Sequence, residues 1–373
     1  MEKLKSYIES AVTGLDAIKR APIVDFETNL HCLRIQDVSQ SKEVSCWGYT
    51  NAHLEGIESF IIKKDDTFVA RTGSTIGCNF FSKRDLNSVF NNGLIRLRTN
   101  SKMIPRFLGY LVQTNDFRKY VNNVSMSSAT QPNIKINDLL DYDLVVPELD
   151  KQQHIVDTIG SVDDLIENYQ SQSAKICSLL VKSLEKYNKK CLFKEYNPKI
   201  IKSGIYMFDN SKEYIDTSSI EGINNFQKGE IITYTKRPSR ANMQPLNNSV
   251  WFAKMKGSYK VILVNNDFEI INKMILSTGF MGIIANKELP LSLLFAIIIS
   301  NEFTIQRDIH SVGTTMAGVN NETFINIEVP FLSYDERTSF EYINRPFIDK
   351  LSRLRIQINE LKEIKNSLLK KYF

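Results

Sequence analysis

Two stretches of the chain place apolar side chains at alternating steps of four and three residues, one near the middle and one at the end. This 3.5-residue period is typical of a coiled-coil seam. The seam positions are Ile155, Ile159, Val162, Ile166, Tyr169, Ile176, Leu180 and Tyr187 in residues 150–190, and Phe347, Leu351, Leu354, Ile358, Leu361, Leu368 and Tyr372 in residues 333–373. Because neither helix can bury its apolar stripe alone, we predict that the two pair with each other as an antiparallel coiled coil.

Both stretches begin with a helix-capping pattern. Asp150 is followed three residues later by Gln153, and Ser333 is followed three residues later by Glu336. In a capping box the first side chain accepts a bond from a backbone N–H of the first turn, and the second side chain returns one. The pattern therefore predicts that the long helices begin at Asp150 and Ser333.

The two helix starts also mark an internal repeat. Pro147 and Pro330 are 183 residues apart (330 − 147), and an overlay at this offset aligns residues 136–147 with residues 319–330. The heptad positions match at an offset of 185, so we expect two residues to be gained just before Pro346. We predict an α+β chain of two strand-rich globular domains, each followed by a long helix. The predicted domains are residues 1–149 and 193–332, and the predicted helices are residues 150–192 and 333–373.

The two halves share one order of elements: strands, a glycine turn, a helix, a polar loop and a long helix. The strand-rich segments are residues 22–100 and 205–284, their glycine turns are 71–77 and 277–282, and the helices that follow are predicted at 104–120 and 291–303. Residues 1–20 place apolar side chains on one helical face and are predicted to form an amphipathic helix. Residues 188–198 are predicted to be a linker.

Composition narrows the class of protein. No apolar run approaches the ~18–20 residues of a membrane span and the start of the chain has no signal-peptide pattern, so we expect no membrane association. Five cysteines without a CxxC spacing favour a reducing, cytoplasmic location over disulfides or a zinc site. A net charge of +5 permits nucleic-acid binding without requiring it.

Catalytic motifs are missing from the sequence. It contains no Walker-type phosphate loop, no strand-linked GxGxxG and no HExxH, and its four histidines are scattered. The ExK patterns in residues 360–365 resemble part of a nuclease metal site, but they lie on the second long helix, where a solvated face explains them better. We therefore expect a non-catalytic chain with no metal and no cofactor of its own.

Several short segments resemble the specificity subunit of type I restriction-modification systems. In chain order they are residues 33–38 (LRIQDV), 70–77 (ARTGSTIG), 131–134 (QPNI), 237–241 (RPSRA) and 276–280 (LSTGF). The plan of two target-recognition domains, each followed by a long helix, resembles the same family over nearly the whole chain. Residues 1–20 do not match the family's opening, and the second exit loop, residues 313–320, keeps little of the QPNI pattern.

The resemblance implies a function in host defence. Each domain would read one half of a split double-stranded DNA target, and the paired helices would fix the distance between the halves. The helices would also dock two methyltransferase subunits, which bind S-adenosylmethionine and modify adenine, and the restriction subunits recruited to them. This chain would supply DNA recognition without catalysis.

Candidate DNA contacts follow from the chemistry of readout. Base edges are read by bidentate donors and amides, and phosphates are held by lysine and arginine. In the second domain such side chains gather in a loop stiffened by Pro238, namely Lys236, Arg237, Ser239, Arg240 and Asn242, for which a solvated basic turn is the alternative. In the first domain the candidates are Arg71, Thr72, Lys83, Arg84 and Arg34, the last being either a DNA contact or a salt-bridge partner at a strand edge.

Two other functions compete with this one. A nuclease or methyltransferase would show metal- or cofactor-dependent activity as the pure chain. A coiled-coil scaffold, or a DNA-binding module outside restriction-modification, would differ in its helices or its partners. A scaffold would pair its helices between chains and form a homodimer insensitive to salt and without affinity for DNA.

Overall fold

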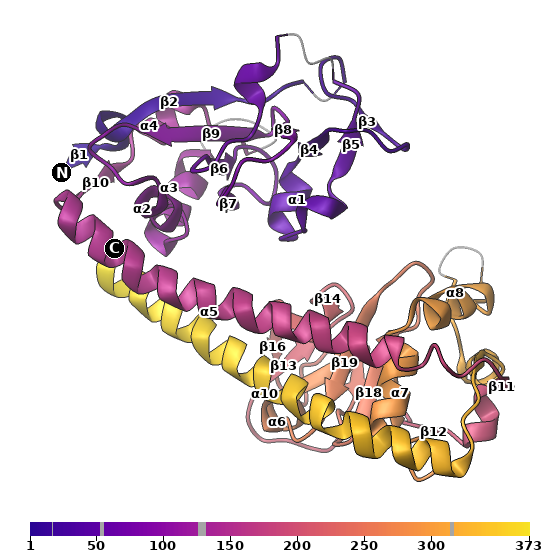
Figure 1. Cartoon of the computed structure of the whole chain (residues 1–373). Helices are drawn as coiled ribbons and strands as arrows, with labels where there is room; N and C mark the ends of the chain where they lie inside the picture. Colours follow the sequence, from indigo (N-terminus) through magenta and orange to yellow (C-terminus); the bar gives the residue numbers. More distant parts are fainter. Residues whose placement is uncertain (17, 53–55, 126–131, 314–316) are drawn as a thin grey trace. The chain divides into compact units, whose positions relative to one another are not determined.

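The computed structural model describes residues 1–16, 18–52, 56–125, 132–313 and 317–373 (Figure 1). The chain forms two compact units: unit 1 is Met1–Asp164 with Glu363–Phe373, and unit 2 is Leu165–Lys362. The division passes through both long helices, α5 (Leu149–Lys182) and α10 (Tyr334–Tyr372), so each unit contains one globular domain and a segment of each helix. The four-part division expected from the sequence stays a prediction.

Unit 1 contains two four-stranded sheets and a two-stranded ribbon. The strand orders are β2-β9-β6-β7 and β3-β5-β4-β8, and β1 pairs with β10 in the ribbon. The elements are β1 (Glu2–Lys3), η1 (Leu4–Tyr7), β2 (Ile8–Thr13), β3 (Ile23–Val24), β4 (His31–Leu33), α1 (Ile35–Ser39), η2 (Val44–Cys46), β5 (Gly48–Thr50), η3 (Glu58–Phe60), β6 (Thr67–Ala70), β7 (Asn79–Phe81), β8 (Ser88–Phe90), β9 (Leu94–Thr99), α2 (Pro105–Leu111), α3 (Asn115–Ser125), α4 (Ile136–Leu140) and β10 (Asp143–Leu144).

The first sheet of unit 1 is buried on both faces. Successive side chains of a strand point to opposite faces. Val69 of β6 and Ile95 of β9 therefore enter the core formed with α2, α3 and the start of α5, while Phe68 and Ala70 enter the core shared with the second sheet. This double burial explains why Phe68, Val69 and Ala70, which follow the buried Thr67 in β6, form an apolar run.

Unit 2 repeats this plan with more strands. Its strand orders are β12-β21-β18-β19-β14-β15 and β16-β13-β20-β17, and β11 pairs with β22 in the ribbon. The elements are β11 (Lys190–Leu192), η4 (Phe193–Tyr196), β12 (Lys199–Ile200), β13 (Lys212–Ile215), β14 (Ile220–Ile223), β15 (Asn225–Phe226), β16 (Glu230–Ile232), β17 (Ala241–Met243), β18 (Ser249–Ala253), β19 (Lys260–Val264), α6 (Phe268–Lys273), β20 (Met274–Ser277), β21 (Phe280–Ile284), α7 (Leu291–Ile298), α8 (Asn301–Ile309), α9 (Asn321–Phe324) and β22 (Glu328–Pro330).

Strand β18 divides the core of unit 2 in the same way as β6 divides that of unit 1. Val250 and Phe252 pack towards α7 and the segments of the two long helices. Trp251 and Ala253, on the other face, pack with β20 of the second sheet. Each unit is thus a sheet covered by helices on one face and by a second sheet on the other.

The long helices run antiparallel within each unit (Figure 1). In unit 1, Ile159 near the start of α5 shares a core with Leu369 near the end of α10. In unit 2, Leu180 near the end of α5 shares a core with Phe340 near the start of α10 and with Leu354 at its middle. Lys365, which lies between the seam positions Leu361 and Leu368, donates to the Asp163 carboxylate over 2.8 Å, so its charge is compensated at the helix pair.

Most of the predicted seam residues are shielded from solvent. Those that are buried are Ile155, Ile159, Val162, Ile166, Ile176, Leu180, Leu351 and Leu354. Those that are half-buried and packed against a core are Tyr169, Tyr187, Phe347, Leu368 and Tyr372, and Ile358 and Leu361 are half-buried as well.

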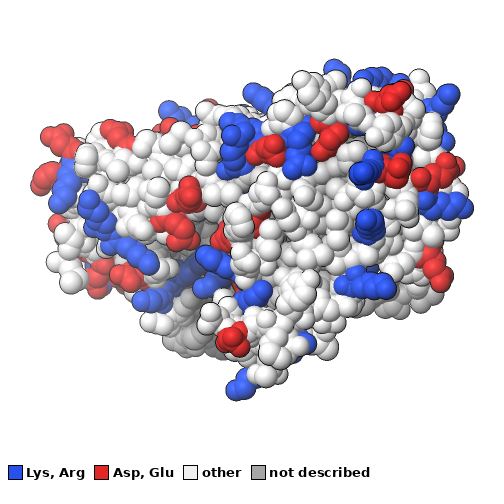
Figure 2. Space-filling model, turned by 90° about the horizontal axis from the view of Figure 1, so that it is seen from below, with Lys and Arg blue, Asp and Glu red and all other residues white. Residues whose placement is uncertain are grey.

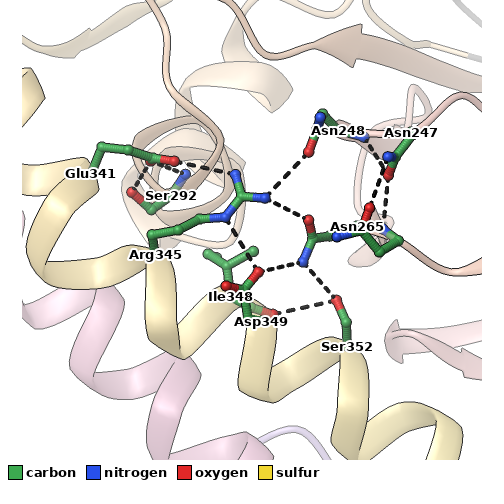
Figure 3. A network of polar contacts seen from close by, with 10 residues as sticks. Asn247, Asn248, Asn265, Ser292, Glu341, Arg345, Ile348, Asp349 and Ser352 are labelled. Carbon is green, nitrogen blue, oxygen red and sulfur yellow. Dashed lines mark hydrogen bonds and ion pairs between the residues drawn. The ribbon is translucent and has the colours of Figure 1, made fainter.

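Polar contacts fasten α10 to the sheet of unit 2 (Figure 3). The Arg345 guanidinium donates to Asn265 Oδ1 over 2.8 Å and to the carboxylates of Asp349 and Glu341 over 3.3 Å each. Asn265 in turn donates to Asp349 over 2.9 Å. Because Asn265 follows directly after β19, this network sets the position of the helix against the end of that strand.

The internal repeat has an offset of 185 residues on both sides of the helix start. Leu139 N donates to Lys135 O, and Phe324 N donates to Asn320 O at the equivalent turn (324 − 139 = 185). The helices begin at Leu149 and Tyr334, again 185 apart. The 183-residue overlay of the two prolines is therefore wrong, and no two residues are gained near Pro346.

One of the two predicted capping boxes is present. Ser333 N donates to Glu336 Oε2 over 2.7 Å, and Glu336 N donates to Ser333 Oγ over 3.4 Å. Asp150 lies inside the first turn of α5 and is not its N-cap. At this end the Gln152 side chain makes the polar contacts instead. Its Oε1 accepts from Ile104 N, and its Nε2 donates to the carbonyls of Lys102 and Pro147.

Several predicted element boundaries are wrong. Residues 1–20 do not form a helix: β2 pairs with β9, whose edge would otherwise lack a partner. Helix α5 ends at Lys182 and does not reach residue 190 or 192, because the chain tightens into turns there. Residues 188–198 are not a linker, since β11 and η4 bury Phe193 and Tyr196 in the core of unit 2.

Each predicted helix after the strands is a pair of shorter helices. In the first domain the break falls between α2 and α3, where Thr114 Oγ1 accepts from Phe117 N over 3.3 Å. In the second it falls between α7 and α8, where Ser300 Oγ accepts from Phe303 N over 3.1 Å. A hydroxyl cap starts a new helix at the same place in both units.

The buried ion pair on α10 gives a stability prediction. Arg355 donates to Asp267 over 2.5 Å and to Glu269 over 3.1 Å, and both side chains of the Arg355–Asp267 pair are at most 5% exposed. Arg355→Met leaves the Asp267 carboxylate buried without its partner, so we expect unit 2 to lose about 3–5 kcal/mol in urea unfolding. The matched control, Arg353→Met, changes an exposed residue of the same helix and should stay within about 0.5 kcal/mol. Equal effects of the two substitutions would contradict the structural role of the pair.

Candidate nucleic-acid interface

In unit 1 four segments meet at the end of strand β6. Arg71, the first residue after β6, donates its backbone N–H to Gly93 O over 2.9 Å and accepts from Ile134 N over 2.9 Å. Gly93 lies in the turn between β8 and β9, and Ile134 in the exit loop that leads to α4. Asn91 N donates to Leu33 O over 3.0 Å and brings the end of β4 to the same place. The backbone of Arg71 is therefore fixed on both sides.

Unit 2 builds the same junction from other residues. Lys254, the first residue after β18, donates its backbone N–H to Gly279 O over 3.0 Å and accepts from Val319 N over 3.1 Å. Strand β18 occupies the place of β6, because each is the neighbour of the strand that precedes the helices. Lys254 is thus the structural equivalent of Arg71, and Gly279 is that of Gly93.

The two equivalent glycines are required by close packing. A Cβ atom on Gly93 would lie 2.6 Å from Ile35 Cδ1, and one on Gly279 would lie 2.9 Å from Thr217 Cγ2. Both glycines also donate their N–H to a side chain two residues earlier, Gly93 to Asn91 and Gly279 to Ser277. Larger residues would open the junction.

The sequence comparison paired the wrong glycine turns. Residues 71–77 connect β6 to β7, and their structural counterpart is residues 254–259, between β18 and β19. The turn at Gly279 connects β20 to β21 and corresponds to residues 91–93. Because all these turns contain glycine, only the order of strands in the sheets distinguishes them.

The two equivalent cations differ in their partners. The Arg71 guanidinium donates to Asn133 Oδ1 from Nε over 3.3 Å and from Nη2 over 3.2 Å, and Thr72 pairs with Asn133 through the backbone. Gly318 stands at the position of Asn133 in unit 2 and has no side chain to offer. Lys254 is half-buried, and the pKa of its ammonium group is lowered by burial and then by the positive charge of Arg240.

Two residues of the basic loop of unit 2 make contacts within their own unit. Arg237 lies over the Tyr234 ring, 4.3 Å from its centroid, and donates to the Tyr234 carbonyl. Lys236, Ser239 and Arg240 are exposed. The last residue of the predicted set, Asn242, uses its backbone carbonyl to accept from Gly204 N over 2.8 Å. Their assignment as DNA contacts stays a prediction.

The remaining candidates of unit 1 lie in two segments, one after β7 and one between β4 and α1. Lys83 lies 3.8 Å from the Asp164 carboxylate of α5, and Arg84 is exposed beside it. Arg34 Nε donates to Asp37 over 3.1 Å, and the Asp37 side chain is fully buried. Of the two roles considered for Arg34, the structure shows the salt bridge. The junction gathers Arg71 and Thr72, whereas Lys83 and Arg84 lie after β7.

Lys254 was missed by the sequence reasoning, although a weak signal was present. The run Phe68-Val69-Ala70-Arg71 has its counterpart in Trp251-Phe252-Ala253-Lys254: two bulky residues, an alanine and a cation. Asn133 was noted only as part of a family-like segment, without a partner.

Charge alone does not mark the interface. Figure 2 shows one face of the molecule, over which lysine and arginine side chains are interspersed with aspartate and glutamate. Among the residues that the structure describes, no group of three or more histidine, cysteine, aspartate or glutamate side chains is placed to hold a metal ion. Over the same described ranges, no helix combines the length and apolarity needed to cross a membrane.

Comparison with known proteins supports the resemblance seen in the sequence. Residues 39–178 match the family described as type I restriction modification DNA specificity domain. None of the curated proteins matches the chain. The fold is similar to the crystal structure of the type I restriction-modification system S subunit from M. genitalium, with a TM-score of 0.52 and 15% identity over 100% of this chain and 95% of that one. The HsdS subunit from Thermoanaerobacter tengcongensis also matches, with a TM-score of 0.36 and 14% identity over 100% and 95% of the two chains. The predicted family resemblance and α+β fold class are thereby confirmed.

The role of Arg34 is open to a direct test. Arg34→Gln removes one charged partner of the buried Asp37 carboxylate, while Lys42 remains 3.5 Å away. We expect a loss of about 1–2 kcal/mol in the unfolding of unit 1. Arg84→Gln, an exposed change in the same unit, should leave stability unchanged. If Arg34→Gln instead leaves stability intact and lowers DNA affinity, Arg34 is a DNA contact.

Proposed function

Since residues 39–178 match the family described as type I restriction modification DNA specificity domain, we propose that the chain is the DNA-recognition subunit of a type I restriction-modification complex. Each unit reads one half of a bipartite double-stranded target. The chain docks two methyltransferase subunits, which bind S-adenosylmethionine, and the restriction subunits. It works in the cytoplasm and contributes no catalytic residue.

The observation that carries this proposal is the repeated junction. The same backbone clamp holds Arg71 in unit 1 and Lys254 in unit 2, with a glycine turn on one side and the exit loop on the other. Two copies of one recognition frame, with different side chains at equivalent positions, are what a reader of two different half-sites requires. A frame with identical side chains would favour two identical half-sites.

The antiparallel helices support the bipartite reading. Each unit buries its own segment of both helices in its core. Because α5 and α10 each pass through both units, we propose that these helices set the spacing of the half-sites, as half-site spacing is built into dimeric DNA-binding proteins. Polar anchors at equivalent helix starts, Gln152 in unit 1 and Arg337 in unit 2, hold the loop that precedes α2 or α7.

A coiled-coil scaffold is less well supported. Such a protein would use its seam to pair with a second chain. Here the seam is occupied within each unit, because Leu180 and Leu354 are fully buried without a second copy. The helix faces left for partners are those outside the seam.

Adenine methylation gives the test of this function. The chain is expressed with its methyltransferase subunits in a host without other adenine methylation, and methylated adenines are mapped across the genome. We expect one bipartite motif with a fixed unspecified spacer, and no methylation when the chain is omitted. A contiguous motif, or the same methylation without this chain, would contradict the proposal.

Substitution of Arg240 tests the contribution of unit 2 to DNA binding separately from that of unit 1. Arg240 is exposed at the end of the basic loop of unit 2. If it contacts a base, Arg240→Ala should relax the preference at one position of one half-site, at a cost of about 1–3 kcal/mol. If it contacts a phosphate, binding should weaken for all sequences alike and depend less on salt. Arg84→Ala, in unit 1, is the matched control and should leave the half-site of unit 2 unchanged. Unchanged affinity of Arg240→Ala at every salt concentration would show that residues 236–242 are only a solvated turn.

A further inference from the structure

Two cations lie close together in unit 2 without an acidic partner. Lys254 is half-buried at the end of β18, and Arg240 precedes β17. Within the described part of the chain, neither side chain forms an ion pair, whereas Arg71, the equivalent of Lys254, is held by Asn133. Burial first, and then the positive charge of Arg240, lower the pKa of the Lys254 ammonium. An arrangement of this kind is costly unless an anion joins it.

The turn at Gly279 holds the two cations in place. Lys254 N donates to Gly279 O over 3.0 Å, and Thr278 N donates to Arg240 O over 2.9 Å. Arg240 Nη2 lies 3.0 Å from the point that a Cβ on Gly279 would occupy, and Thr217 Cγ2 lies 2.9 Å from the same point. Both cations are therefore anchored through their backbones on one turn, and the guanidinium covers the glycine.

The Asp216 carboxylate, beside Thr217, is engaged by hydrogen bonds within its own turn. Asp216 Oδ1 accepts from Ser218 Oγ over 2.7 Å and from the backbone and hydroxyl of Ser219 over 2.9 Å each. A third cation, Lys260, donates to Thr217 O over 2.5 Å at the same strand end. Asp308, which accepts from Gly257 N in the turn after Lys254, is paired with Arg307 over 2.7 Å and not with Lys254 or Arg240.

We propose that Lys254 and Arg240 together bind one phosphate of the DNA backbone, which places unit 2 on its half-site. This inference rests on the proposed function and names a contact within it. A recessed ammonium is a point charge without directional specificity, which suits a phosphate better than a base edge. Phosphate contacts fix register and orientation and leave sequence readout to other side chains. The phosphate also supplies the negative charge that the pair lacks.

The test compares salt dependence of binding by the full chain with its methyltransferase subunits. The probe is a random-sequence 40-base-pair duplex, followed by fluorescence anisotropy at several salt concentrations, alongside a duplex that carries the mapped target. In Lys254→Met we expect weaker binding to both duplexes by the same factor. The slope of log K against log salt should fall in magnitude by about 0.9, the value for one phosphate contact. Lys287→Met, an exposed change in the same unit, is the control and should keep the wild-type slope.

The outcomes distinguish a failure of the phosphate site from a failure of the proposed function. If the wild-type complex binds neither duplex, the proposed function fails. If the wild type binds and Lys254→Met has an unchanged slope, only the phosphate site is overturned. A loss confined to the target duplex would make Lys254 a base contact and would also overturn it. Because Lys254→Met removes a half-buried charge beside a like charge, its melting temperature should not fall. Should it nevertheless fail to fold, Arg240→Gln on the exposed side of the pair must show the same loss of slope.

Discussion

The structure depends on the burial of two long amphipathic helices inside one chain. Neither α5 nor α10 can cover its stripe alone, and each spends part of its length in each unit. Within unit 2 the helices are covered by α7 and the first sheet, and within unit 1 by α2, α3 and the first sheet. The stripe is therefore buried by the partner helix and by the domain together. This explains why the two domains have the same order of elements: each must present the same apolar face to the same pair of helices.

The backbone of the junction is the same in the two units, whereas the side chains on it differ. The constant part is backbone: strand ends, two glycines and the exit loops, joined by hydrogen bonds that recur in both units. The variable part is side chains: Arg71 with Asn133 in unit 1, and Lys254 with Arg240 in unit 2. A backbone frame tolerates such changes because its bonds do not depend on side-chain identity. Two half-sites of different sequence then need only different side chains on one scaffold.

The sequence predicted what is local and missed what depends on distant pairing. Heptads and the Ser333–Glu336 box lie within a few residues, and both appear in the structure. The strand at residues 8–13 was predicted as a helix, because its apolar spacing is compatible with a helix and with a strand. Only the pairing with the distant strand β9 makes it a strand. Lys254 was missed for the same reason, since its equivalence to Arg71 exists only in the order of the strands. Residues 126–131, most of the first exit loop, lie outside the described residues.

The central claim is that the paired helices measure the distance between two half-sites. It is tested by inserting one heptad into each helix at the division between the units, after Asp164 and after Lys362, and mapping adenine methylation. The insertion preserves the seam and lengthens the pair by about 10 Å, which corresponds to about three base pairs of B-DNA. The account predicts both half-sites unchanged with a spacer longer by about three base pairs, and loss of methylation when four residues are added to α5 alone. Methylation at the original spacing by the heptad-extended protein would contradict it.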